Sequence, residues 1–151
     1  MKTAEIDATD SKILRELQRN GRATFSYLGL RVGLSPGATA ERVRRLVQLG
    51  VIDGFHARIN LGAVGRAIDA MVDVRLNATA DPDEFERRVA ELPSVCEIIF
   101  VTGRFDYLLR LACRDAVDLD STVRVLRQEA WAAVTETRVV LRSRVCVPTL
   151  A

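Results

Sequence analysis

The sequence has little of what disulfide-bonded, membrane-spanning and metal-binding proteins depend on. Its 151 residues include three cysteines, an odd number, and a single histidine. No run approaches the roughly 18 consecutive apolar residues of a membrane span, and the first residues lack the apolar centre of a signal peptide. Because each cysteine stands among aliphatic residues or alanine, we expect reduced thiols in a cytoplasmic protein.

Groups that could support catalysis are also scarce. His56 is far in sequence from any cysteine or paired carboxylates, which argues against a Ser-His-Asp arrangement or a metal site. Two acidic pairs stand where helices are predicted to begin, and capping explains them: Asp81 with Asp83, and Asp118 with Asp120. We therefore expect no enzyme activity, no metal and no cofactor, and a surface or structural role for His56.

Charge is divided unevenly along a chain of otherwise ordinary composition. Hydrophobic residues make up 48% and charged residues 28%, which is typical of a folded chain. Residues 1–65 carry ten Lys and Arg against six Asp and Glu, whereas residues 66–151 carry twelve against fourteen. The basic first part is the candidate for binding a polyanion.

Three closely spaced helices are predicted in the first part, at about residues 7–20, 25–32 and 36–49. Asp7 and Asp10 have the spacing of a helix-capping box, and Ser35-Pro36 is a cap followed by proline. Gly29, in the second helix, is small enough to let another helix come close. Val51 to Ile59, with Asp53-Gly54 at its turn, then predicts a short hairpin. This order predicts a winged helix-turn-helix.

The exposed side of the third helix decides what such a domain binds. Thr39, Val43 and Leu46 share its inward side. The opposite side carries Gly37, Ala40, Glu41 and Arg44, flanked by Arg42 and Arg45. A basic helix face is often simply solvated, but after a turn of this length, in a basic segment, we expect it to contact DNA.

The second part predicts strands and helices in the order βαββαβ. The expected strands are 68–76, 95–102, 105–113 and 134–147, with helices beginning near 82 and 115. This order predicts a ferredoxin-like sandwich, so the chain as a whole is of the α+β class. We expect an apolar sheet face that the chain does not cover and that a second copy covers in a two-fold dimer. The predicted domains are 1–60 and 67–151, with 61–66 as a linker.

With these segments in order, the sequence resembles the Lrp/AsnC (feast/famine) family of transcriptional regulators. In the first part the resemblance rests on Asp7-Xaa-Xaa-Asp10-Xaa-Xaa-Ile13-Leu14, Asn20-Gly21-Arg22-Ala23, Val32-Gly33-Leu34-Ser35, Arg42-Val43-Arg44-Arg45-Leu46 and Gly50-Val51-Ile52-Asp53-Gly54-Phe55. In the second part it rests on Gly103-Arg104-Phe105-Asp106-Tyr107-Leu108-Leu109 and Thr135-Glu136-Thr137. Together these segments cover nearly the whole chain. The resemblance implies a DNA-reading domain, then a domain that dimerises and in many members binds an amino acid. It also implies assembly beyond the dimer, commonly to octamers.

The resemblance further implies two sets of site residues. Those expected at the DNA are Ser35, Pro36, Gly37, Ala40, Glu41, Arg42, Arg44, Arg45 and Arg58, the last in the predicted wing. Those expected at an amino-acid effector are Gly103, Phe105, Asp106, Tyr107, Thr135 and Thr137. Asp106 would be the counter-ion of the effector's ammonium group, with nearby amides and hydroxyls as donors to its carboxylate. Ordinary structural roles also stay open: Gly103 can permit a tight hairpin, and Asp106 can bond the turn backbone.

These observations predict a sequence-specific transcription regulator. It would bind double-stranded DNA as a homo-oligomer, a dimer at least, and an amino acid bound between subunits would modulate its assembly. Two-fold symmetry would favour an imperfectly palindromic operator. The alternative is an amino-acid-sensing or assembly module whose helix-turn-helix no longer regulates genes. The basic first part argues against that alternative.

Overall fold

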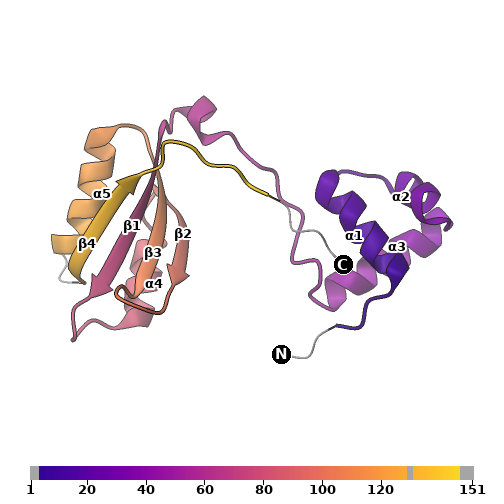
Figure 1. The fold of residues 1–151 in the computed structure, drawn as a ribbon, viewed down its shortest axis with the longest axis horizontal. Helices are drawn as coiled ribbons and strands as arrows, with labels where there is room; N and C mark the ends of the chain where they lie inside the picture. Colours follow the sequence, from indigo (N-terminus) through magenta and orange to yellow (C-terminus); the bar gives the residue numbers. More distant parts are fainter. Residues whose placement is uncertain (1–3, 129–130, 147–151) are drawn as a thin grey trace. The chain divides into compact units, whose positions relative to one another are not determined.

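The computed structural model describes residues 4–128 and 131–146. The chain divides into two compact units. The first comprises the residues up to Arg58 together with Val145 and Cys146, and the second runs from Ile59 to Arg144. Figure 1 draws the helical first unit and the sheet-containing second unit. In the part of the chain that the structure describes, no helix is long and apolar enough to cross a membrane.

The first unit contains the three predicted helices. They are α1 (Ala8–Arg19), α2 (Phe25–Val32) and α3 (Pro36–Gln48). The capping box of α1 is confirmed, because the Asp10 amide donates to Asp7 Oδ1 at 2.7 Å and the Asp7 amide donates to Asp10 Oδ2 at 3.2 Å. Thr24 and Ser35 cap α2 and α3 with one bond each, since their hydroxyl oxygens accept from the Tyr27 and Ala38 amides. Local sequence thus fixes where each helix begins.

The turn between α2 and α3 depends on two glycines. Gly33 ends α2 in the left-handed conformation with φ 73°. At Gly29 an added Cβ would lie 2.5 Å from the Leu34 carbonyl oxygen and 3.1 Å from Thr39 Oγ1. The predicted close approach to Gly29 is therefore confirmed. Both the backbone of the turn, at Leu34, and α3, at Thr39, come close to it. The core beneath it consists of Ile13, Leu14, Leu28, Val43 and Leu46.

The predicted hairpin after α3 does not form, because residues 51–60 contain no strand. A two-residue hairpin turn needs positive φ angles, and here it is Gly50, at φ 68°, that takes the left-handed conformation, not Gly54. Val51 and Ile52 pack against the helical core, and their amides donate to the Leu46 carbonyl at 2.9 and 3.1 Å. Packing on the helices thus replaces strand pairing. A short 3-10 helix, η1 (Leu61–Val64), follows in the stretch expected to be a linker.

The second unit has the predicted βαββαβ order. Its elements are β1 (Ile68–Leu76), α4 (Pro82–Val89), β2 (Val95–Phe100), β3 (Tyr107–Cys113), α5 (Ala116–Gln128) and β4 (Ala132–Val139). The strands form one antiparallel sheet in the order β2-β3-β1-β4. β4 is shorter than the expected 134–147. Its partner β1 begins at Ile68, and the Val140 amide makes a final bond to the Asp69 carbonyl, so later residues have no strand to pair with.

Both helices of this unit cover the same face of the sheet. Val72, Val74 and Leu109 project from the strands into a core that contains Phe85 of α4 and Leu126 of α5, all fully buried. Figure 1 shows α4 and α5 beside the sheet, whose strands lie next to one another in the order given. The ferredoxin-like sandwich predicted from the element order is confirmed.

The other face of the sheet is mixed, whereas the sequence led us to expect an apolar face. Met71 lies between Asp69 and Asp73 on it, and Leu108 of β3 and Ile99 of β2 lie in register with Asp73. Asp69 and Asp73, at alternate positions of β1, bind arginines of the neighbouring strands: Arg110 at 2.7 Å from Asp69, and Arg138 of β4 with Asp73. Glu136, directly opposite Asp73, binds Arg104 at 2.8 Å. The pattern of β1 alternates apolar and polar residues, and the polar ones find partners on strands distant in sequence.

Candidate DNA-binding face and effector turn

The α3 helix buries one side and exposes the other. Thr39, Val43 and Leu46 are buried, whereas Gly37, Glu41 and Arg44 are exposed. The alternation follows from 3.6 residues per turn, which places Glu41 and Arg44 on the solvent side of a helix anchored at the three buried positions. The start of α3, at Ser35 and Pro36, is also exposed.

Ala40 was expected on the exposed side, but it is only 7% exposed. One residue after Thr39 it is turned by about 100° around the helix, which places it at the edge of the buried side. Ala38 and Gln48 are exposed on α3, yet neither was singled out from the sequence. Their spacing could have revealed them, since Ala38 precedes Glu41 by three residues and Gln48 follows Arg44 by four.

Arg44 and Glu41 form an ion pair on this exposed face. Arg44 Nη1 lies 3.1 Å from Glu41 Oε2, and the two side chains are 67% and 78% exposed. Pairs of this kind contribute little free energy in water. Arg44 can therefore exchange Glu41 for a base edge or a phosphate at small cost, and Glu41 can exchange Arg44 for a base edge.

Arg42 and Arg45, by contrast, are bound by carboxylates of the α1 region. Arg42 Nη1 donates to Asp7 Oδ2 at 2.7 Å and to Asp10 Oδ1 at 2.9 Å, and Arg45 donates to Asp10 Oδ2. The hydrogen bonds that Arg42 donates to Asp7 and Asp10 raise the pKa of Arg42. The pKa of Asp7 is lowered by the bond from the Asp10 backbone amide and then by Arg42. These arginines link α3 to α1 as well as facing solvent.

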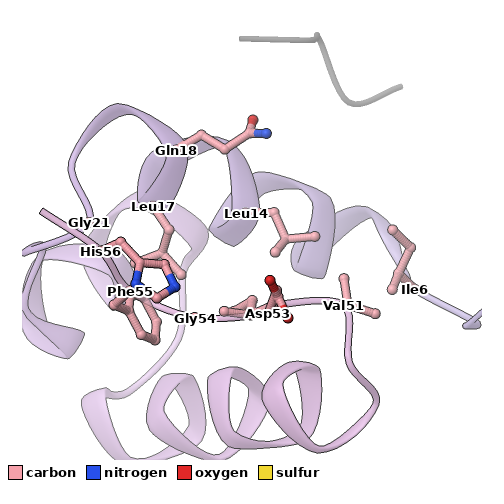
Figure 2. A pocket seen from close by; sticks show the side chains of 11 residues that line it. Ile6, Leu14, Leu17, Gln18, Gly21, Val51, Asp53, Gly54, Phe55 and His56 are labelled. Carbon is pink, nitrogen blue, oxygen red and sulfur yellow. The ribbon is translucent and has the colours of Figure 1, made fainter. Parts of the chain in front are cut away.

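Arg58 lies outside regular structure. It is exposed and belongs to the segment 51–60, which does not form the expected wing strands. The same segment borders a hollow of about 480 Å³ on the first unit. Figure 2 shows its lining, where Leu14 and Leu17 of α1 stand opposite Val51, Phe55 and His56. The lining is mostly apolar, and Asp53 and His56 are the titratable side chains in it.

The predicted effector turn joins β2 and β3. Gly103 has φ 120°, a conformation that side chains other than glycine rarely adopt. Asp106 accepts a hydrogen bond from the Leu76 amide at 2.8 Å, and its own amide donates to the Val74 carbonyl at 2.9 Å. Asp106 is thus held against the end of β1, so at least one of its carboxylate oxygens has a structural role.

Tyr107 is a core residue. It is 1% exposed, its hydroxyl donates to Glu86 Oε1 at 2.8 Å, and its ring lies 4.8 Å from that of Phe85. Burial and the Glu86 carboxylate raise the pKa of Tyr107. Phe105, which precedes the strand, is half-buried with the Arg104 guanidinium 4.7 Å from its ring centre.

The two threonines lie on the helix-covered side of β4. Thr135 is directly opposite Val74, which on its other side faces Tyr107. The structure therefore brings Tyr107 and Thr135 into one row across three strands. Thr135 Oγ1 accepts from Arg127 Nε at 2.7 Å, whereas Thr137, opposite Val72, is exposed. Among the described residues no group of three or more His, Cys, Asp or Glu side chains is placed to hold a metal.

Comparison with known protein families matches both units. The AsnC-type helix-turn-helix domain matches residues 6–47, and the Lrp/AsnC ligand binding domain matches residues 69–150. Both matches fall on the segments whose geometry is described above.

Individual relatives agree. The chain is 36% identical over 143 residues to the HTH-type transcriptional regulator AldR of Mycobacterium tuberculosis, covering 93% of this chain and 80% of the relative. It is 40% identical over 114 residues to the leucine-responsive regulatory protein of Salmonella typhimurium, covering 74% and 69%. Among solved structures, a transcriptional regulator from Neisseria meningitidis in complex with L-Met superposes with a TM-score of 0.89 at 29% identity, covering 97% of each chain.

Proposed function

The chain belongs to the Lrp/AsnC family of transcriptional regulators, a family of non-enzymes, and from this premise we propose that it binds operator DNA sequence-specifically and responds to an amino acid. Residues 1–60 would read the DNA, and residues 67–151 would bind the effector and form the oligomer, joined by residues 61–66. The proposal places the protein in the cytoplasm with its DNA.

The observation that carries DNA binding is the exposed face of α3. Arg44 and Glu41 project from a helix whose opposite side is locked into the core, so their positions on the surface are fixed. Arginine offers paired donors to guanine, and glutamate offers an acceptor to cytosine. Gly37 lets the helix backbone approach closely, and the first amides of α3, near Ser35 and Pro36, suit a phosphate. Arg42, Arg45 and Arg58 are proposed as phosphate contacts. Ala40 is buried and is therefore left out of the proposed DNA contacts.

The effector site is proposed at the turn from Gly103 to Asp106. The L-Met complex of the Neisseria meningitidis regulator supports an amino acid as the class of ligand. Asp106 would bind the ammonium group, with Thr135, Thr137 and the turn amides as donors to the carboxylate. Phe105 would border the ligand, whereas Tyr107 supports the site from the core because its ring and hydroxyl are already occupied.

The active form is proposed to be a two-fold dimer that assembles further, to an octamer. Two α3 helices related by a two-fold axis would read half-sites about one helical turn of DNA apart. A ligand changes this assembly only if it binds one oligomeric state more tightly than another. The other candidate function, an effector-sensing module without gene control, is disfavoured by the exposed Arg44.

Binding to DNA upstream of the protein's own gene tests the first part of this proposal. Wild type should produce a shift that weakens steeply with salt. Arg44→Ala should weaken binding by roughly 1–3 kcal/mol and leave the oligomer intact. Arg19→Ala is the matched control, since it removes an exposed arginine from α1. Equal losses in the two variants, or a dissociated oligomer in Arg44→Ala, would contradict the assigned role of α3.

Thermal unfolding with each of the twenty amino acids tests the second part. An effector that binds only the folded state increases the free energy of unfolding by mass action, by about 2.7 kcal/mol at a hundredfold excess over Kd, and so raises Tm. Asp106→Asn keeps an acceptor for the Leu76 amide but removes the charge that the ammonium group needs. The variant should therefore fold, bind DNA and lose the Tm response. A retained response would exclude Asp106 as the counter-ion.

A further inference from the structure

The carboxylate of Asp10 is buried beneath α3, between two arginines of that helix. Its side chain has 0% exposure, whereas those of Arg42 and Arg45 are 32% and 46% exposed. Arg42 Nη1 lies 2.9 Å from Asp10 Oδ1, and Arg45 Nη2 contacts Asp10 Oδ2. One buried anion thus holds the inner edge of two guanidinium groups that both reach solvent.

Asp7 completes this cluster. Its Oδ2 accepts from Arg42 Nη1 at 2.7 Å, and the capping box connects its backbone and side chain to those of Asp10. Asp7 and Asp10 begin α1, while Arg42 and Arg45 lie on α3, more than thirty residues away. The start of α1 therefore restrains both arginine side chains, which would otherwise occupy many rotamers.

We propose that Asp10 is a positioning residue for DNA binding, which holds Arg42 and Arg45 with their outer N–H groups presented to phosphates. The inference rests on the proposed DNA-binding function and assigns a role to a residue that cannot touch DNA itself. A guanidinium carries five N–H donors in a fixed plane, and both described bonds of Arg42 use the single nitrogen Nη1. Donors therefore remain for a phosphate while the inner edge stays bound.

Two explanations of this carboxylate predict opposite effects of removing its charge. If Asp10 only neutralises nearby arginines, then Asp10→Asn adds one positive charge per subunit and should strengthen DNA binding. If it positions them, the arginines become mobile, and binding should weaken although the net charge has become more favourable. The sign of the change in affinity distinguishes positioning from simple charge.

The experiment is a fluorescence-anisotropy titration of an upstream duplex that wild type binds, repeated over a series of salt concentrations with full-length protein. We expect Asp10→Asn to bind roughly tenfold more weakly, equivalent to about 1.4 kcal/mol. The slope of log K against log salt should become shallower by about 0.9 for each phosphate that the arginines no longer neutralise. Asp53→Asn is the matched control: it makes the same charge change at an exposed carboxylate of the first unit, and it should bind at least as tightly as wild type.

Asp7→Asn covers the case in which Asp10→Asn does not fold. Asparagine caps helices as well as aspartate does, and the Asp7 side chain is 51% exposed, so this change removes the charge while preserving the start of α1. It should weaken binding less than Asp10→Asn, with a smaller change in the salt slope, because Arg42 loses one of its two carboxylate partners and Arg45 keeps its own. Thermal unfolding and stoichiometric DNA titration give the folded, active fraction of each variant.

The outcomes separate this inference from the function on which it rests. Weaker binding with a shallower salt slope, in folded Asp10→Asn or Asp7→Asn, supports positioning. If wild type binds and the folded variants bind equally or more tightly, the positioning role is overturned while DNA binding stands. A wild-type protein that binds none of the upstream DNA overturns the proposed function itself.

Discussion

Replacing Gly29 by alanine should destabilise the first unit, although alanine is the better helix former. The substitution gains up to about 1 kcal/mol of helix propensity. The new Cβ, however, would stand 2.5 Å from the Leu34 carbonyl oxygen and 3.1 Å from Thr39 Oγ1. A backbone oxygen cannot rotate away as a side chain can, so the cost should lie at about 2–3 kcal/mol, in the upper part of the usual range for overpacking. We expect a net loss of about 1–2 kcal/mol, or a fall in Tm of roughly 5–15 °C for a unit of this size.

Gly37→Ala is the matched control for this prediction. It makes the same change in the neighbouring helix, where an added Cβ meets nothing within 4 Å. It should gain a few tenths to about 1 kcal/mol. Scanning calorimetry of the full chain measures both shifts, and amide hydrogen exchange in α2 and α3 assigns them to the first unit. If Gly29→Ala proves as stable as wild type, or if both variants shift in the same direction, the argument from close backbone approach is wrong.

Four further predictions concern the second unit. The pKa of Tyr107 is raised above the ordinary value of about 10, so the unfolded chain loses the hydroxyl proton at a lower pH than the folded chain does. The free energy of unfolding should therefore fall as pH rises past about 10. In urea titrations, Tyr107→Phe should make that fall smaller. At neutral pH the same variant loses the bond to Glu86 and should cost about 0.5–1.5 kcal/mol. Phe85→Ala, which empties a fully buried site, should cost about 3–5 kcal/mol by urea unfolding. Gly103→Ala should lower the free energy of unfolding by roughly 1–3 kcal/mol, because residue 103 has a φ of 120°. The fall in Tm measures this loss, which alanine at an unstrained glycine should not cause.

Features encoded by neighbouring residues could be predicted from the sequence. The caps at Asp7, Thr24 and Ser35 depend on bonds that span three residues, and all three are present. The βαββαβ order follows from changes in hydrophobic period along the chain, and the sheet order is the one that a ferredoxin-like fold gives it.

Features decided by distant residues could not be predicted in this way. Asp53-Gly54 is a hairpin dipeptide by composition, but burial of Val51 and Ile52 against the helices prevailed over local turn preference. The link from Asp10 to Arg45 spans 35 positions, and no local pattern indicates it. For the same reason the ion pairs on the uncovered sheet face could not be predicted, because the arginines that pair with Asp69 and Asp73 lie on other strands.

The single tryptophan of the chain has a practical consequence. Trp131 lies edge-on to Phe85, with ring centres 6.2 Å apart, and the Arg88 guanidinium lies 5.2 Å from its indole. Intrinsic indole emission therefore originates in the second unit alone. A stopped-flow recording of that emission, with tryptophan excited selectively so that Tyr27 of the first unit does not contribute, would time events around the sheet with no dye or label attached.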